Sequence, residues 1–111
     1  MAKIVILGAG VMGSAFSIPC IENNHKTINV GTHLDDDFID HINKNNNFHP
    51  VLKTKLSDKT KFIKQNELSD QKNNSPDLLV IGTNSKGIDW CPEQLKKIGL
   101  SITLPPILLL T

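Results

Sequence analysis

The sequence predicts an α/β fold in which helices cover both faces of a parallel sheet. Three observations lead to this prediction. Short apolar runs alternate with helix-like segments along the whole chain, without an internal repeat. The apolar runs at 4–7 and 77–82 do not alternate with polar residues, which is typical of parallel strands buried on both faces. A glycine-rich turn joins the first run to the first helix-like segment.

Composition indicates one globular domain over residues 1–111, with 39% hydrophobic and 21% charged residues. The net charge of +1 gives no sign of nucleic-acid or membrane partners. Two cysteines are too few for a disulfide framework and favour a reduced, cytoplasmic setting. Glycines interrupt the N-terminal apolar run, which argues against a signal peptide, and the run at 107–110 is too short to cross a bilayer.

Each element follows from the local pattern. Asparagines 23 and 24 are stop signals for the first helix, and Pro19 should kink it or end it early. The asparagine-rich segment 43–50 is expected to be a loop, and Gly99 to close the last helix. The expected strands are 3–7, 27–31, 61–63, 77–82 and 105–111, and the expected helices are 11–22, 34–42, 66–72 and 88–99. We predict the sheet order 3-2-1-4-5, in the order of these strands along the chain.

The glycine-rich turn has the spacing G-x-G-x-x-G and lies between a strand and a helix, which is the context that this motif needs. Gly8 permits the tight turn, Gly10 lets a diphosphate approach the backbone, and Gly13 lets the helix pack close to the strands. Free N–H groups at the helix start then bind the phosphates. The motif therefore predicts a Rossmann-type domain that binds a dinucleotide, NAD(P)H.

The end of the second strand bears on the choice between NAD and NADP. An acidic residue there would bind the adenosine ribose and favour NAD, but this chain has Thr32 and His33. Both can hydrogen-bond a 2′-phosphate, so we expect NADPH to bind at least as tightly as NADH. The acidic run 35–37 is an alternative source of the acid, although capping of the next helix is the favoured role for it.

Several segments together resemble the amino-terminal half of bacterial NAD(P)-dependent glycerol-3-phosphate dehydrogenase. They are VILGAGVMGSAFSIP, VGTHLDD, HPVLKTKLSD, DLLVIGTNSKGIDW and PPILLLT. The resemblance implies a Rossmann cofactor domain followed by a helical substrate domain, in a homodimeric enzyme. It implies reduction of dihydroxyacetone phosphate to sn-glycerol 3-phosphate with NADH or NADPH, for phospholipid synthesis.

The resemblance also assigns residues to the cofactor site. Val11 and Met12 would turn their backbone amides to the phosphates, Thr32 and His33 would lie at the adenosine end, and the segment 82–85 would lie along a ribose. The residues so assigned are Gly8, Gly10, Val11, Met12, Gly13, Thr32, His33, Gly82, Thr83, Asn84 and Ser85.

No catalytic residue is assigned. The chain ends at Thr111, before the family's lysine-bearing T-K-G segment and before the helical domain that carries a second lysine. We therefore expect a domain truncated after its fifth strand, which binds cofactor without turnover and takes a phosphorylated substrate only with the missing domain. The alternatives are a stand-alone or degenerate dinucleotide-binding module, and a fragment of another Rossmann dehydrogenase acting on a 2-hydroxy acid or a sugar acid.

Other conspicuous residues receive structural interpretations. Histidines recur every eight residues from position 25 to position 49, but across different element types, which argues against a metal site. Cys20 and Cys91 are expected to be structural thiols, and Trp90 a packing anchor. The lysines between 53 and 64 are expected to be solvated rather than a nucleic-acid patch.

Overall fold

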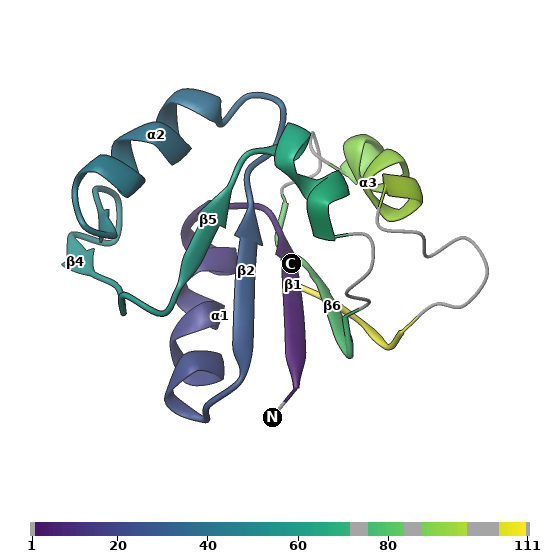
Figure 1. The fold of residues 1–111 in the computed structure, drawn as a ribbon, viewed down its shortest axis with the longest axis horizontal. Coiled ribbons are helices and arrows are strands. Elements are labelled where there is room, and N and C mark those ends of the chain that lie inside the picture. The colour runs from purple at the N-terminus through teal and green to yellow at the C-terminus, as the bar shows by residue number, and fades with distance from the viewer. Residues whose placement is uncertain (1, 72–75, 84–87, 98–104, 111) are drawn as a thin grey trace.

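The computed structural model describes residues 2–71, 76–83, 88–97 and 105–110. Five parallel strands form one sheet in the order β5-β2-β1-β6-β7 (Figure 1). Their bounds are β1 Lys3–Leu7, β2 Lys26–Val30, β5 Lys61–Ile63, β6 Leu78–Ile81 and β7 Ile107–Leu109. This is the predicted 3-2-1-4-5 order with the first strand central, so the predicted α/β, Rossmann-type fold class is confirmed.

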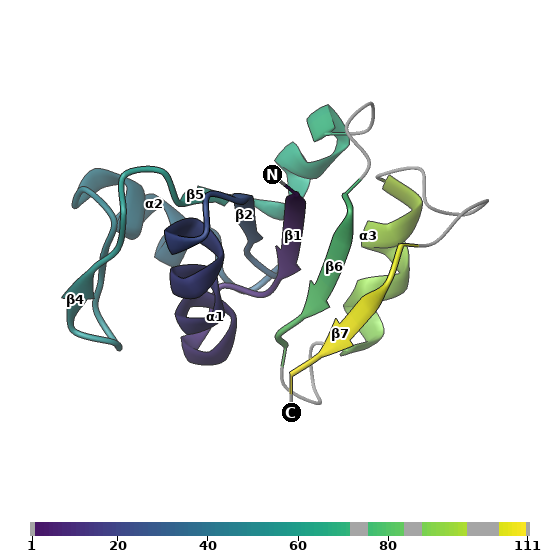
Figure 2. The same cartoon turned by 90° about the horizontal axis from the view of Figure 1, so that it is seen from below.

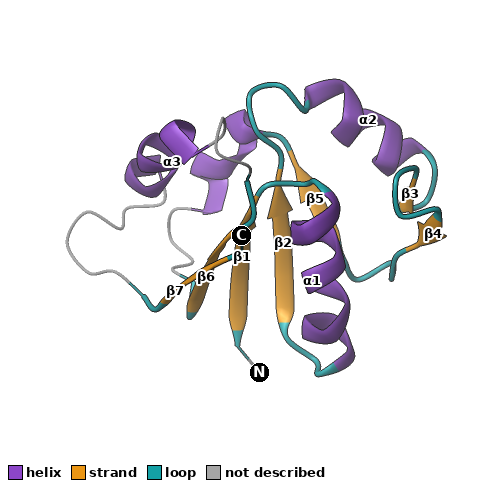
Figure 3. Ribbon diagram, turned by 180° about the vertical axis from the view of Figure 1, so that it is seen from behind, coloured by secondary structure: helices purple, strands orange, loops and turns teal. Residues whose placement is uncertain are grey.

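Helices cover both faces of the sheet, as predicted. Figures 2 and 3 show α1 and α3 on opposite sides of it, with α2 on the side of α1. The α-helices are α1 Val11–Glu22, α2 Asp36–Lys44 and α3 Cys91–Lys97, and the 3-10 helices are η1 Gln65–Gln71 and η2 Ile88–Trp90. The helix predicted over 66–72 is thus a 3-10 helix, and the one predicted over 88–99 begins as a 3-10 turn. Gly99 lies outside the described residues.

The central strand β1 is buried on both faces, which explains its unbroken apolar sequence. Val5 and Leu7 belong to a core cluster with residues of β2, β6, η1 and η2. Ile4 and Ile6 belong to a second cluster on the opposite face, together with Cys20 of α1. The side chains of β1 therefore pack on both faces of the sheet, each face against its own layer of helices.

Trp90 is the packing anchor that the sequence predicts. Its ring is buried in the cluster with Val5 and Leu68, and its indole Nε1 donates a hydrogen bond of 2.7 Å to Gln65 Oε1. This contact fastens η2 to η1 on the face opposite α1. Cys20 and Cys91 are both buried free thiols, as expected.

Of the two effects expected of Pro19, a kink or an early end of the first helix, the early end is wrong. The proline lies inside α1, and the helix continues to Glu22. The asparagines stop it instead: the Asn23 N–H donates to Pro19 O at 3.1 Å, and Asn24 adopts a left-handed φ of 64°. The predicted stop at residues 23 and 24 is therefore confirmed.

The segment expected to be a loop contains a strand. Two short strands, β3 Phe48–His49 and β4 Thr54–Lys55, pair antiparallel as a small hairpin outside the main sheet. Left-handed residues precede it at Asn46 and Asn47, and another, Lys53, lies in its turn. Phe48 is exposed and His49 is fully buried, so the hairpin turns the histidine inward.

Within the described ranges, no helix is both long and apolar enough to span a membrane.

Candidate functional site

A pocket of about 400 Å³ opens at the carboxyl end of the sheet. The loops that follow β1, β2 and β6 meet there, where the strand order reverses direction, and such crevices are the usual ligand sites of open α/β sheets. The lining residues are Gly8, Ala9, Gly10, Val11, Thr32, His33, Leu34, Asp35, Phe38, His49, Val51, Gly82 and Thr83.

The three glycines of the motif have different structural roles. Gly8 has a φ of +122°, and a Cβ there would lie 2.9 Å from Gly82 O. A Cβ at Gly13 would lie 2.6 Å from Gly8 O, so only glycine lets α1 pack this close to β1. A Cβ at Gly10 would meet nothing within 4 Å. The fold therefore needs glycine at positions 8 and 13, whereas at position 10 the space without a side chain belongs to the pocket.

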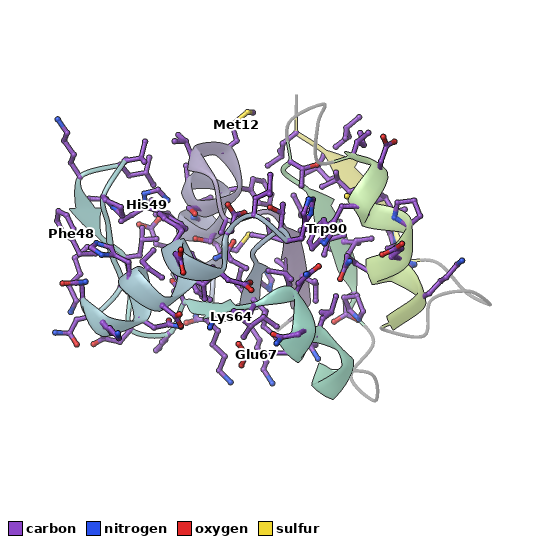
Figure 4. All side chains as sticks on the ribbon, turned by 90° about the horizontal axis from the view of Figure 1, so that it is seen from above. Met12, Phe48, His49, Lys64, Glu67 and Trp90 are labelled. Atoms are coloured by element: carbon purple, nitrogen blue, oxygen red, sulfur yellow. The ribbon has the colours of Figure 1, made fainter. Side chains whose placement is uncertain are left out.

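The first turn of α1 borders the same space. Gly10 is the N-cap residue, and no side chain of the described residues caps the helix. The first amides of an α-helix have no partner within the helix, and the helix dipole makes this end partly positive. Val11 lines the pocket, whereas Met12 and Gly13 do not. Met12 is 48% exposed and extends outward in Figure 4.

At the end of β2, Thr32 is bound to Asp35. The Asp35 Oδ2 atom accepts hydrogen bonds from both the backbone N–H and the hydroxyl of Thr32, each 2.9 Å long. Asp35 is the N-cap residue of α2 but makes no side-chain capping bond to that helix. The capping role expected for Asp35 is therefore wrong. Its carboxylate turns back toward β2, and Asp35 lines the pocket together with the exposed His33.

His49 reaches the pocket from the hairpin. Its Nδ1 accepts a hydrogen bond from the Leu52 N–H at 3.1 Å, and its Nε2 lies 3.4 Å from Ala9 O. The edge of its ring contacts Phe38 of α2, with 5.1 Å between ring centroids. Burial lowers the pKa of His49, and the hydrogen bond to Ala9 offsets part of that effect. In Figure 4 the histidine lies between the hairpin and the start of α1.

The loop after β6 closes the other side. Gly82 and Thr83 line the pocket, while Asn84 and Ser85 lie outside the described residues. The Thr83 hydroxyl lies 3.9 Å from the Cys91 sulfur. Burial raises the pKa of Cys91, so this cysteine stays a thiol at neutral pH, as a structural residue would.

The structure thus brings together most of the assigned residues that it describes. Sequence reasoning offers Asp35 only as an alternative source of the ribose-binding acid, and it misses five lining residues: Ala9, Leu34, Phe38, His49 and Val51. A signal existed for Asp35, because acids follow the second strand closely. For the residues of α2 and the hairpin, no short motif gives a position relative to the glycine turn.

The described part of the chain shows neither a cationic side chain in the pocket lining nor a metal-binding cluster. The pocket lining contains neither lysine nor arginine there. No group of three or more histidine, cysteine or acidic residues is arranged to hold a metal ion in those ranges either. The described lining is mainly glycine, apolar and hydroxyl groups, and its ionisable side chains are His33, Asp35 and His49.

No family model matches the sequence, and a search of curated proteins gives no significant match. Solved structures do share its fold. D-mandelate dehydrogenase, in a ternary structure with NADH and anilino(oxo)acetate, has a TM-score of 0.70 at 20% identity. An Enterococcus faecalis protein described as a 2-dehydropantoate 2-reductase has a TM-score of 0.68 at 25% identity. RSP, a Rex-family repressor, has a TM-score of 0.59 at 15% identity.

These likenesses extend over nearly the whole chain, 97%, 98% and 99% of it respectively. The chain spans 33% of each of the first two proteins and 53% of the third. It therefore corresponds in fold to one part of each larger protein. None of the three is a glycerol-3-phosphate dehydrogenase.

Proposed function

We propose that this chain is the dinucleotide-binding domain of an NAD(P)-dependent dehydrogenase or reductase. The observation that carries the proposal is the open space at Gly10, beside the uncapped first turn of α1. A diphosphate placed there meets backbone amides and the positive end of a helix, on the side of Gly10 where a Cβ would meet no atom within 4 Å. The crystallised D-mandelate dehydrogenase, of the same fold, holds NADH.

The rest of the pocket suits the other parts of such a ligand. Asp35 and Thr32 offer polar groups for the adenosine ribose, and Leu34 and Phe38 offer apolar surface for the adenine. Thr83, which follows β6 and lines the same pocket, is assigned in this proposal to the second ribose. The bound cofactor supplies a hydride, and these residues bind and orient it.

We further propose glycerol-3-phosphate dehydrogenase as the parent enzyme. The support is the sequence resemblance, including the HPVLKTKL segment that forms the hairpin beside the pocket. A phosphorylated substrate needs a cationic partner, and the described lining offers none. The cation must therefore come from outside the described pocket, as the lysines of that family do.

A second candidate is a reductase of 2-oxo acids. The specific observation in its favour is that both dehydrogenase-like neighbours are named for such chemistry, mandelate and 2-dehydropantoate. The two candidates share the cofactor site and differ in the group beside the reacting carbon, which is a phosphate ester in one and a carboxylate in the other.

Direct titration tests the cofactor proposal. NADH fluorescence should rise and shift to shorter wavelength on adding the purified chain, and ADP-ribose should compete, because it carries the same diphosphate. Gly10→Val should abolish both effects. An unchanged NADH spectrum at millimolar chain, with the protein shown to be folded by circular dichroism, would contradict the proposal.

The substrate proposal is tested on the longest product of the gene. NADH oxidation should be measured with dihydroxyacetone phosphate and with 2-dehydropantoate. Turnover of the phosphate ester alone supports the glycerol-3-phosphate assignment, whereas turnover of the 2-oxo acid alone supports the second candidate.

A further inference from the structure

We propose that His49 is a positioning residue that fixes the Ala9–Gly10 peptide for diphosphate binding, an inference that rests on the proposed dinucleotide site. His49 is 40 residues away in the sequence, and the hairpin brings it to the glycine turn. Its effect on the ligand is exerted through the backbone of this turn.

The hydrogen-bond network assigns the tautomer of His49. Its Nδ1 accepts from the Leu52 N–H and is therefore unprotonated, so in the neutral ring Nε2 carries the proton. Nε2 then donates to Ala9 O, 3.4 Å away. The side chain is fully buried and both of its nitrogens are used, which leaves the ring one orientation.

The Ala9 carbonyl has a second donor. The hydroxyl of Ser14 donates to the same oxygen at 2.9 Å, and Ser14 is also fully buried. Two buried side chains, one from α1 and one from the hairpin, therefore hold one carbonyl between them. Such a clamp stops the peptide from rotating about its flanking bonds.

The orientation of the carbonyl determines that of the next amide. In a trans peptide the C=O and the following N–H point in opposite directions, and the described residues include no cis peptide bond. With Ala9 O held by Ser14 and His49, the Gly10 N–H points away from both. Among the described residues it has no hydrogen-bond partner, and Gly10 lines the pocket. A free amide held in one direction at an anion site is preorganised for binding.

Two amide variants separate the two bonds of His49. The amide nitrogen of glutamine reaches the position of Nε2, so His49→Gln keeps the donor to Ala9. The amide oxygen of asparagine reaches the position of Nδ1, so His49→Asn keeps the acceptor for Leu52 but loses the donor. The pair is matched in polarity, and each variant retains one of the two hydrogen bonds of His49.

We expect His49→Asn to bind NADH about tenfold more weakly than wild type, the loss typical of one misplaced hydrogen bond to a charged group. His49→Gln should stay close to wild type. Binding of adenosine, which has no phosphate, should be unchanged in both variants. Equal NADH affinities for the two variants would overturn the positioning role while leaving the proposed function intact.

A measurement on the wild-type chain without ligand tests the inference even if the variants do not fold. Long-range proton–nitrogen NMR of the histidine ring should report the Nε2–H tautomer for His49. The opposite tautomer would overturn the inference. Failure of the folded wild type to bind NADH would overturn the proposed function and this inference with it.

Discussion

The carboxylate of Asp35 holds Thr32 by two hydrogen bonds of 2.9 Å, to its amide and to its hydroxyl. This pair sets a negative charge at the end of β2, where the sequence shows no acid directly after the strand. The Thr32 hydroxyl, expected to be free for a 2′-phosphate, already donates to that charge. Of the two side chains expected to bind a 2′-phosphate, Thr32 is thus already engaged with a carboxylate that would repel the phosphate.

We accordingly expect wild-type chain to bind NADH about tenfold more tightly than NADPH, because Asp35 accepts from a ribose hydroxyl and repels a 2′-phosphate. Asp35→Asn should remove this preference by improving NADPH affinity. Asp37→Asn is the matched control, since it makes the same charge change on an exposed residue of the same helix. Fluorescence titration of both cofactors measures the ratio, and equal ratios in the two variants would refute the role of Asp35.

The two glycines at positions 10 and 13 should separate binding from stability. Gly10→Val should eliminate NADH binding yet lower the free energy of unfolding by only about 1 kcal/mol, the usual cost of a β-branched residue at an N-cap, because its Cβ enters open space. Gly13→Ala should lose roughly 2–3 kcal/mol, because its Cβ meets the Gly8 carbonyl. Urea denaturation and NADH titration of both variants provide the comparison. A strongly destabilised Gly10→Val would show that the space is not open.

The buried side chain of Asn29, in the middle of β2, offers a stabilising change. Within the described part of the chain, neither its Nδ2 nor its Oδ1 has a hydrogen-bond partner, and the residue is fully buried. Asn29→Leu has nearly the same shape and should raise the free energy of unfolding by about 1 kcal/mol. Ser17→Ala is the contrasting control, because the buried Ser17 hydroxyl donates to Ser14 O and its loss should destabilise. Loss of stability in Asn29→Leu would point to a buried water at this position.

The free energy of unfolding should decrease as the pH is lowered, and part of this decrease should depend on His49. Its pKa in the folded chain is lowered by burial below the ordinary value of 6.5, so the unfolded chain takes up the proton first as the pH falls. The contribution of neutral His49 is complete above pH 6.5 and is lost as the pH drops through the lower, folded pKa. Urea unfolding at pH 7.5 and pH 5 should show a smaller difference for His49→Gln than for wild type. As a control, the variant His41→Gln, which changes an exposed histidine, should show the same difference between the two pH values as wild type.

The sheet and the glycine turn could be predicted from the sequence because, in these segments, the local residue pattern reflects the same contacts that the folded chain makes. The run from Ile4 to Leu7 is apolar at every position, and only a central parallel strand buries both sides of such a run. The spacing of Gly8 and Gly13 reflects contacts within one strand–turn–helix unit, which a short motif captures.

The sequence was insufficient where contacts connect distant segments. The hairpin has only two residues in each strand, too few for a periodic pattern, and His49 is buried by contacts with Ala9 and Phe38. The carboxylate of Asp35 had two competing partners nearby, the start of α2 and the end of β2. Propensity favours the cap, but the structure pairs it with Thr32.

The central place of β1 has a consequence for the timing of folding during synthesis. β1 leaves the ribosome first, but one of its neighbours, β6, pairs with it only after about 74 further residues, as the register Ile4–Leu78 requires. The turn at Gly8 packs against the backbone of Gly82. The glycine turn of the nascent chain therefore lacks this contact until Gly82 has emerged from the ribosome. A nascent chain arrested before β6 should present the bare edge of β1 to chaperones, and its folding should be slowed by this long-range closure.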